Sequence, residues 1–225
     1  MRDWRIFWEA QTRPLHRFDD EEHYRTYAQE LVMLFDSRGP QSVLELGCGN
    51  GALFRHLGFA VCGRYRGVDF STSMLQVFEA DYPGVDVVQA DADSYMDDKK
   101  YDLIFSSEFV QYLTMKGFDR SIANAKRMLE PTGRIVCASV PWKALRRRYF
   151  SGECAANPSG GDIRKTLRLM AGRLTSKIGT WYELADFIDT AQRHDLNVAF
   201  HGSFHYPYRF HAVLTARSDH NQVHR

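Results

Sequence analysis

Cysteine is scarce in this chain of 225 residues and is not arranged in pairs. The four cysteines show neither C-x-x-C spacing nor a histidine at zinc-ligand spacing; they are Cys48, Cys62, Cys137 and Cys154. This distribution argues against a disulfide framework and against a zinc site, so no metal is expected. Scattered, reduced thiols are typical of a cytoplasmic protein.

Long apolar segments are missing as well. No uncharged run approaches the roughly 20 residues that a membrane-spanning helix requires. The first five residues, Met-Arg-Asp-Trp-Arg, lack the apolar stretch of a secretory signal. We therefore expect a cytoplasmic protein without a membrane span.

An excess of charge of one sign is also absent. The 29 basic side chains nearly balance the 28 acidic ones, which gives a formal net charge of +1. No global field therefore attracts the chain to nucleic acid, and we expect no nucleic-acid partner. The length suits one domain with a sizeable core, and the sequence contains no internal repeat or low-complexity tract.

The most informative feature that is present is a glycine-rich turn. Residues 43–52 read VLELGCGNGA: an apolar strand that contains Glu45, then alternate glycines, then a helix pattern. Glycines let the backbone turn tightly and let a ligand approach the main chain. The start of the helix would offer unpaired N–H groups. This turn therefore predicts a nucleotide or cofactor site at the carboxyl end of a first β-strand.

Two interpretations compete for these glycines. A dinucleotide fingerprint fits Gly47, Gly49 and Ala52, and Asp69, 22 residues beyond Gly47, would then bind the ribose. That pattern alone would suit a nicotinamide-dependent oxidoreductase. The complete E-x-G-x-G-x-G pattern instead closely resembles motif I of the class I S-adenosylmethionine-dependent methyltransferases.

The resemblance continues along the chain in the order that this family shows. Residues 67–71 (GVDFS) resemble its second strand, and residues 87–92 (VVQADA) resemble its third. Residues 101–108 (YDLIFSSE) resemble its fourth strand, and residues 129–136 (LEPTGRIV) resemble the turn into the fifth. The similarity covers residues 40–142 continuously and the segment 180–216 more loosely.

The resemblance implies a site for S-adenosylmethionine, with S-adenosylhomocysteine as the product. The glycines would approach its methionine end, Glu45 would order the loop, and Asp69 would bind the ribose hydroxyls. Phe70 and Met74 would flank the adenine. The residues that the resemblance assigns to the cofactor are Glu45, Gly47, Cys48, Gly49, Gly51, Asp69, Phe70, Met74, Asp91, Ala92 and Ser106.

Strand and helix patterns alternate from residue 41 onward, which predicts a parallel sheet with helices on both faces. A capping-box pattern from Thr180 to Glu183 predicts a helix that continues to about His194. The chain end resembles the antiparallel hairpin that closes a Rossmann-like, seven-stranded, mostly parallel sheet. We expect strands at 41–46, 65–69, 86–90, 102–105, 134–139, 198–204 and 208–215, and helices at 22–35, 52–58, 71–80 and 119–129.

The helix at 22–35 either packs on the sheet or, as in many relatives, covers the cofactor. Trp4, Trp8, Tyr24 and Tyr27 would line such a lid. We expect a single methyltransferase domain over 1–225, divided into an N-terminal helical lid (1–40), a cofactor-binding core (41–142), a basic substrate-cap insertion (143–180), and a last helix with the closing hairpin (181–216).

The insertion at 143–180 has a strong basic bias, with only Glu153 and Asp162 as acidic residues, and apolar residues recur at helical spacing from Ile163 to Ile178. Three interpretations stay open: a solvated face, a cap that neutralises an anionic acceptor, and an amphipathic helix on an anionic membrane surface. The candidate acceptor-binding residues in this insertion and in the hairpin are Trp142, Arg146, Arg147, Tyr206 and Tyr208.

Methyl transfer is an in-line displacement in which the protein aligns the acceptor, excludes water and, for a hydroxyl acceptor, takes a proton. A base should lie at the carboxyl ends of the strands, where Glu108, Tyr112 and His205 are the candidates. His205 is preferred because the ordinary pKa of histidine lies near neutrality. His201 and His211 lie in predicted strands and are expected to pack there.

The sequence therefore predicts a class I methyltransferase that acts on an oxygen or nitrogen of a small or glycan-linked, anionic acceptor. Residues 106–109 lack the Asn/Asp-Pro-Pro-aromatic signature of enzymes that methylate amino groups of nucleic acids. Two alternatives remain: a catalytically silent relative that serves as a partner subunit, and a nicotinamide-dependent oxidoreductase.

Overall fold

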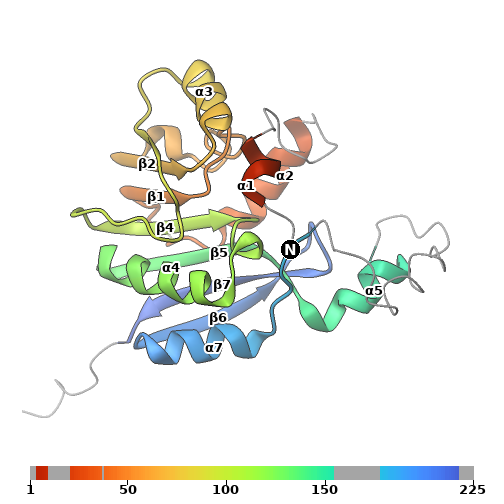
Figure 1. The fold of residues 1–225 in the computed structure, drawn as a ribbon. Helices are drawn as coiled ribbons and strands as arrows, with labels where there is room; N and C mark the ends of the chain where they lie inside the picture. The colour runs from red at the N-terminus through yellow and green to blue at the C-terminus, as the bar shows by residue number, and fades with distance from the viewer. Residues whose placement is uncertain (1–3, 10–20, 37, 155–177, 218–225) are drawn as a thin grey trace, which may run out of the picture.

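The computed structural model describes residues 4–9, 21–36, 38–154 and 178–217 (Figure 1). Its centre is a seven-stranded sheet in the order β3-β2-β1-β4-β5-β7-β6. The pairs from β3 to β5 are parallel, and β7 is antiparallel to both of its neighbours. The strands are β1 (Ser42–Leu46), β2 (Arg64–Asp69), β3 (Val87–Gln89), β4 (Tyr101–Ser107), β5 (Leu129–Pro141), β6 (Leu196–Gly202) and β7 (Arg209–Ala216).

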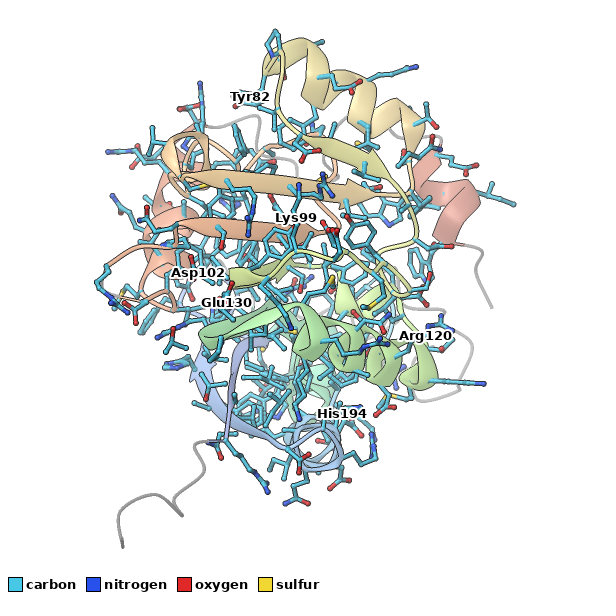
Figure 2. The ribbon with its side chains drawn as sticks, turned by 90° about the vertical axis from the view of Figure 1, so that its left-hand side faces the viewer. Tyr82, Lys99, Asp102, Arg120, Glu130 and His194 are labelled. Atoms are coloured by element: carbon cyan, nitrogen blue, oxygen red, sulfur yellow. The ribbon has the colours of Figure 1, made fainter. Side chains whose placement is uncertain are left out.

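Helices cover both faces of this sheet, which confirms the predicted architecture. α4 and α7 lie next to each other on one face, where Arg120 and His194 mark them in Figure 2. α2 and α3 supply apolar side chains to the core on the other face. The described helices are α1 (Trp4–Glu9), α2 (Glu21–Val32), α3 (Thr72–Asp81), α4 (Met115–Met128), α5 (Arg146–Ser151) and α7 (Leu184–Arg193).

The core has two layers because the central strands are buried on both faces. Every residue of β1 is buried, as the continuous apolar run at its sequence position predicted. Phe118 of α4 and Phe187 of α7 pack in the layer on one face. Leu31 of α2 and Phe78 of α3 pack in the layer on the other face. The helices thus pack against both faces of the sheet, and the carboxyl ends of its parallel strands are left to form a site.

The prediction of a helix at residues 52–58 is wrong. The segment forms a series of turns that ends in a short 3₁₀-helix, Phe59–Val61. Gly58 has a φ of 74°, a left-handed conformation that ends helical propagation. The segment is too short to form the long hydrogen-bonded run that offsets the cost of helix nucleation.

The prediction that Thr180 caps the last helix is also wrong. α7 begins after Glu183, whose backbone N–H donates to the Asp186 carboxylate at 2.8 Å. Thr180 instead donates its hydroxyl to the Leu113 carbonyl at 3.2 Å. The Glu183/Asp186 pair has the same spacing as the expected box but lies three residues later in the chain, so the local pattern was right and its register was not.

Other element boundaries agree with the predictions to within a few residues, except that β5 extends to both sides of 134–139. The helix expected between residues 163 and 178 lies outside the described residues. Within the described ranges, no helix is both long enough and apolar enough to cross a membrane. α5 extends away from the sheet (Figure 1).

Candidate functional site

A cavity of about 340 Å³ opens at the carboxyl ends of β1, β2 and β4. α1 and α2 lie at this same end of the sheet (Figure 1). The cavity wall contains many of the residues that the sequence analysis selected: Glu45, Gly47, Cys48, Gly49, Asp69, Phe70, Met74, Asp91, Ala92, Glu108, Tyr112 and Tyr206. The ends of the parallel strands thus bring together segments that lie far apart in the sequence.

The glycines of the loop after β1 differ in what surrounds them. A Cβ atom on Gly47 would lie 2.8 Å from the Phe109 ring, and one on Gly51 would lie 2.7 Å from the Phe78 ring. A Cβ atom on Gly49 would meet nothing within 4 Å. Gly47 and Gly51 are therefore required by protein packing, whereas the backbone at Gly49 borders open space where a ligand can approach.

Asp69, the last residue of β2, ties the glycine loop to the next helix. Its carboxylate accepts backbone N–H groups from Gly49 at 3.0 Å, from Ser71 at 2.9 Å and from Phe70. A carboxylate oxygen can accept a second hydrogen bond, so a ligand with two adjacent hydroxyls can still be bound. Burial raises the pKa of the Asp69 carboxyl group, against the lowering effect of these N–H donors.

Glu45 is almost completely buried, with 4% of its surface exposed. Its carboxylate accepts a hydrogen bond from the Tyr65 hydroxyl at 2.6 Å. Burial, with a smaller contribution from the Asp69 charge, raises the pKa of Glu45 to about 8. Because its side chain also lines the cavity, a positively charged ligand group beside it would stabilise the ionised form.

Apolar and acidic groups continue the wall beyond Asp69. Phe70 and Met74 form an apolar patch, and Asp91, Ala92 and Asp93 follow β3. The Asp93 carboxylate is paired with the Arg120 guanidinium at 2.5 Å. This part of the wall suits a flat aromatic group with a hydrogen-bond donor at its edge.

Aromatic rings from the first helix close the cavity on another side. The rings of Trp4 and Trp8 pack on the Tyr112 ring, with centroids 4.8 and 5.4 Å apart. All four residues that the sequence predicted for a lid, including Tyr24 and Tyr27, line the cavity. Burial, and next the charge of Glu108, raises the pKa of Tyr112 to about 12, so at neutral pH its hydroxyl group is protonated.

Glu108 follows β4 directly and lines the cavity beside Ser107 and Phe109. Its φ of 53° is unusual for a residue other than glycine, and strain of this kind is often found at functional sites. The Glu108 carboxylate lies 3.6 Å from the guanidinium of Arg209, which is buried. The resulting charge pair connects β4 to the closing hairpin.

The other predicted site residues are not among those that line the cavity. The side chain of Ser106 is buried in β4, and the Gly51 backbone faces Phe78. The His205 ring packs on Tyr27, with centroids 5.4 Å apart, and its Nδ1 lies 3.8 Å from Glu30. The remaining residues outside the cavity wall are Trp142, Arg146, Arg147 and Tyr208.

Several functional candidates were missed because they depend on contacts between distant segments. His23 lines the cavity and shares a hydrogen bond of 3.1 Å with the Tyr206 hydroxyl. Arg209 sits in a strand, where its sequence context gave no sign of a buried cation. His211, expected to pack in its strand, is indeed buried there, and its Nε2 lies 2.9 Å from a Glu30 oxygen.

The His211 hydrogen bonds define its tautomer. The backbone N–H of Ser139 donates to His211 Nδ1 at 3.1 Å, so Nε2 carries the proton that is donated to Glu30. Glu30 also accepts from the backbone N–H groups of Phe204 and His205. This network fixes α2 against the hairpin and thereby positions the side of the cavity that α2 forms.

The sequence of this chain is similar to those of known proteins. Residues 44–137 match the family model of a methyltransferase domain. An uncharacterized 37.1 kDa protein in transposon Tn4556 of Streptomyces fradiae is 29% identical over 131 residues, which are 56% of this chain and 37% of that protein. The chain therefore matches well under half of this curated relative's length.

Solved structures show the same fold. DesVI of Streptomyces venezuelae superposes with a TM-score of 0.66 at 18% identity, covering 88% of this chain and 93% of that one. The sugar N-methyltransferase KedS8 of a Streptoalloteichus species gives a TM-score of 0.62 at 15% identity, covering 96% and 94%.

The open space beside the Gly49 backbone and the further hydrogen bonds that the Asp69 carboxylate can accept fit S-adenosylmethionine, which a solved methyltransferase of this fold binds. The family match covers β1 to β5, the strands that carry those residues. The fold as a whole, with its antiparallel β7, superposes on that of a solved sugar N-methyltransferase. Residues 44–137 thus resemble a methyltransferase domain, and the fold of the chain is shared with a solved methyltransferase.

Proposed function

We propose that this chain transfers the methyl group of S-adenosylmethionine to an oxygen or nitrogen of a small or glycan-linked acceptor. The observation that carries the proposal is a single cavity that joins the glycine loop and Asp69 to Glu108 and Tyr112. One end of this cavity offers groups that suit a nucleoside and an amino acid. The other end offers polar and aromatic groups that suit a second molecule.

The chain's own residues would hold the cofactor in the following way. Asp69 would accept from the ribose hydroxyls, Glu45 would face the methionine ammonium, and the backbone at Gly49 would approach the methionine end. Phe70 and Met74 would enclose the adenine ring, with Asp91 accepting from its amino group. When bound, the cofactor supplies a sulfonium-activated methyl carbon that an acceptor can attack directly.

At the acceptor end, the protein's main tasks are alignment and exclusion of water. The rings of Trp4, Trp8 and Tyr112 form an apolar wall that keeps water from the reacting centre. The Tyr112 hydroxyl is protonated at neutral pH and so acts as a donor, and Glu108 can accept from the acceptor. His205 has no part in this proposal because its ring packs on Tyr27 and it is not among the residues that line the cavity.

We base the proposed acceptor on the cavity wall, because residues 155–177 of the basic insertion lie outside the described residues. The sequence favoured an anionic acceptor because of the bias at 143–180, but within the described residues no lysine or arginine lines the cavity. We therefore do not carry the anionic preference into the proposal. A small acceptor is supported by the size of the cavity and by the sugar N-methyltransferase among the solved structures of the same fold.

Calorimetric titration and methyl transfer test this proposal together. The purified protein should bind S-adenosylhomocysteine and not NADH, and it should move labelled methyl from S-adenosylmethionine into the small-metabolite or glycan fraction of a cell extract. Asp69→Ala should weaken both signals, whereas Glu79→Gln, an exposed change on α3, should keep both. Label in the nucleic-acid fraction would contradict the acceptor class, and binding without transfer would favour a silent relative.

A further inference from the structure

The charged side chains of the cavity wall already have partners or roles. Within the described residues they are the carboxylates Glu45, Asp69, Asp91, Asp93 and Glu108. The first three are assigned to the cofactor under the proposed function. The Asp93 carboxylate is paired with the Arg120 guanidinium at 2.5 Å, and the Glu108 carboxylate with the Arg209 guanidinium at 3.6 Å. On the described part of the wall, no carboxylate is left over to neutralise a charged acceptor.

Arg209 is buried and held in place behind this wall. Its Nη1 donates to Gln111 Oε1 at 2.7 Å and to a backbone carbonyl of β5 at 2.5 Å. Its guanidinium carbon lies 5.5 Å from the centre of the Tyr206 ring and 5.2 Å from the centre of the Tyr208 ring. Only 5% of the residue is exposed. Arg209 therefore stays beside Glu108, and the pair presents little net charge to the cavity.

An ionised acceptor would lose hydration at this end of the cavity without gaining a partner of opposite charge. A cation would have to compete with Arg209 for the Glu108 carboxylate, and an anion would lie beside that same carboxylate. Moving an ion out of water without a counter-charge is strongly unfavourable, whereas a neutral polar group needs only hydrogen bonds. The arrangement of charges therefore favours a neutral acceptor.

Neutral hydroxyl groups lie on the wall at the end of β4. The Ser107 and Tyr27 hydroxyls share a hydrogen bond of 2.8 Å, and both residues line the cavity. The Tyr27 hydroxyl is also bonded to the hydroxyl of Ser139, which is completely buried. A hydroxyl group can take part in three hydrogen bonds, so Ser107 can still bond to a ligand. A ligand hydroxyl suits this position because it can either donate to Ser107 or accept from it.

The apolar part of the same wall is largely aromatic. The Trp4 and Trp8 rings pack on the Tyr112 ring, with centroids 4.8 and 5.4 Å apart. The Tyr27 ring lies 5.5 Å from the Tyr206 ring, and all five residues line the cavity. Ring faces and edges of this kind pack well against a flat apolar group.

We propose, resting on the methyl-transfer function above, that the acceptor binds as an uncharged molecule that carries an apolar ring and a hydroxyl group. The ring packs among the aromatic side chains of the wall, and the hydroxyl group is hydrogen-bonded to Ser107. The Glu108–Arg209 pair selects against ions of either sign, because neither member of the pair can be released to an ion without leaving the other as a buried, unpaired charge.

Three probes of similar shape test this inference without knowledge of the natural acceptor. 2-Phenylethanol, 2-phenylethylammonium and 3-phenylpropionate differ in charge, and each is titrated by calorimetry at pH 8 into the protein saturated with S-adenosylhomocysteine. The alcohol should bind at least tenfold more tightly than either ion. Ser107→Ala should weaken alcohol binding by about fivefold, through loss of one hydrogen bond. Ser151→Ala, in α5 and outside the cavity wall, should leave the alcohol affinity unchanged.

The comparison of the three probes on the wild-type protein needs no variant, and Ser107→Ala should still bind S-adenosylhomocysteine if it is folded. An ion that binds as tightly as the alcohol, or an alcohol that does not bind, would overturn the neutral acceptor while leaving methyl transfer in place. An alcohol affinity that Ser107→Ala does not change would overturn the role of Ser107. Failure of the wild-type protein to bind S-adenosylhomocysteine would overturn the proposed function as well.

Discussion

Glu45→Gln should change how the stability of this protein depends on pH. Only 4% of the Glu45 surface is exposed, and the Tyr65 hydroxyl donates to its carboxylate at 2.6 Å. The amide oxygen of glutamine can accept the same hydrogen bond with almost the same shape. The substitution therefore removes the ionisation of this side chain and little else.

The expected magnitude follows from the pKa of Glu45, which burial raises from the ordinary 4.5 to about 8. The native state then holds the proton more tightly than the unfolded state, so the free energy of unfolding falls as pH rises from about 4.5 through 8. Each unit of pKa difference corresponds to about 1.4 kcal/mol, which gives at most about 5 kcal/mol across this range. The glutamine variant does not lose this stability.

Urea denaturation at pH 5, 7 and 9, without cofactor, measures the effect. The free energy of unfolding of Glu45→Gln minus that of the wild type should rise by several kcal/mol between pH 5 and pH 9. Glu79→Gln, which removes an exposed carboxylate, should give a difference that changes by less than about 0.5 kcal/mol. A difference for Glu45→Gln that stays constant with pH would refute the claim that this buried carboxyl group is neutral at pH 7.

Three further outcomes are expected. Binding of S-adenosylhomocysteine at pH 7 should release close to one proton from Glu45. Calorimetry in buffers of different ionisation enthalpy measures this release. If no proton is released, the ammonium group of the ligand does not reach Glu45. Asp69→Ala should weaken S-adenosylhomocysteine binding by about 1–3 kcal/mol in the same titration, and an unchanged affinity would contradict the ribose assignment. Gly51→Ala should lower the free energy of unfolding by about 2–4 kcal/mol, because its Cβ atom would lie 2.7 Å from the Phe78 ring. Gly49→Ala, whose Cβ atom meets no other atom within 4 Å, should lower it by about 1 kcal/mol. Chemical denaturation measures both variants, and equal losses of stability would contradict the packing argument.

The parallel sheet and the cofactor loop could be predicted from local patterns. An apolar run such as the one around Leu44 has to be buried on both faces, which identifies a central parallel strand. The glycines after it must adopt positive φ values, as Gly47, Gly49 and Gly51 do. Asp69 follows from its place at the end of the next strand. Each of these conclusions depends on residues that are close together in the chain.

Local patterns were less reliable where a boundary depended on competition between weak signals. The turn after Gly51 has helical residue types, yet Gly58 ends the segment before a helix can form. Two overlapping cap patterns precede α7, and the Glu183/Asp186 pair prevails because Thr180 bonds to Leu113. In both cases the outcome depends on a contact or conformation that the pattern itself does not contain.

The sequence by itself determined the parallel sheet and the glycine loop, because strand periodicity and turn chemistry act over a few residues, and its resemblance to a known family added the closing hairpin and the acidic residues at the cofactor end. Only the tertiary structure decided which side chains meet at the acceptor end. It packed the His205 ring on Tyr27, and it buried Arg209 beside Glu108. Such contacts join segments that lie 100 or more residues apart, and they are set by strand register and helix packing, which no local pattern specifies.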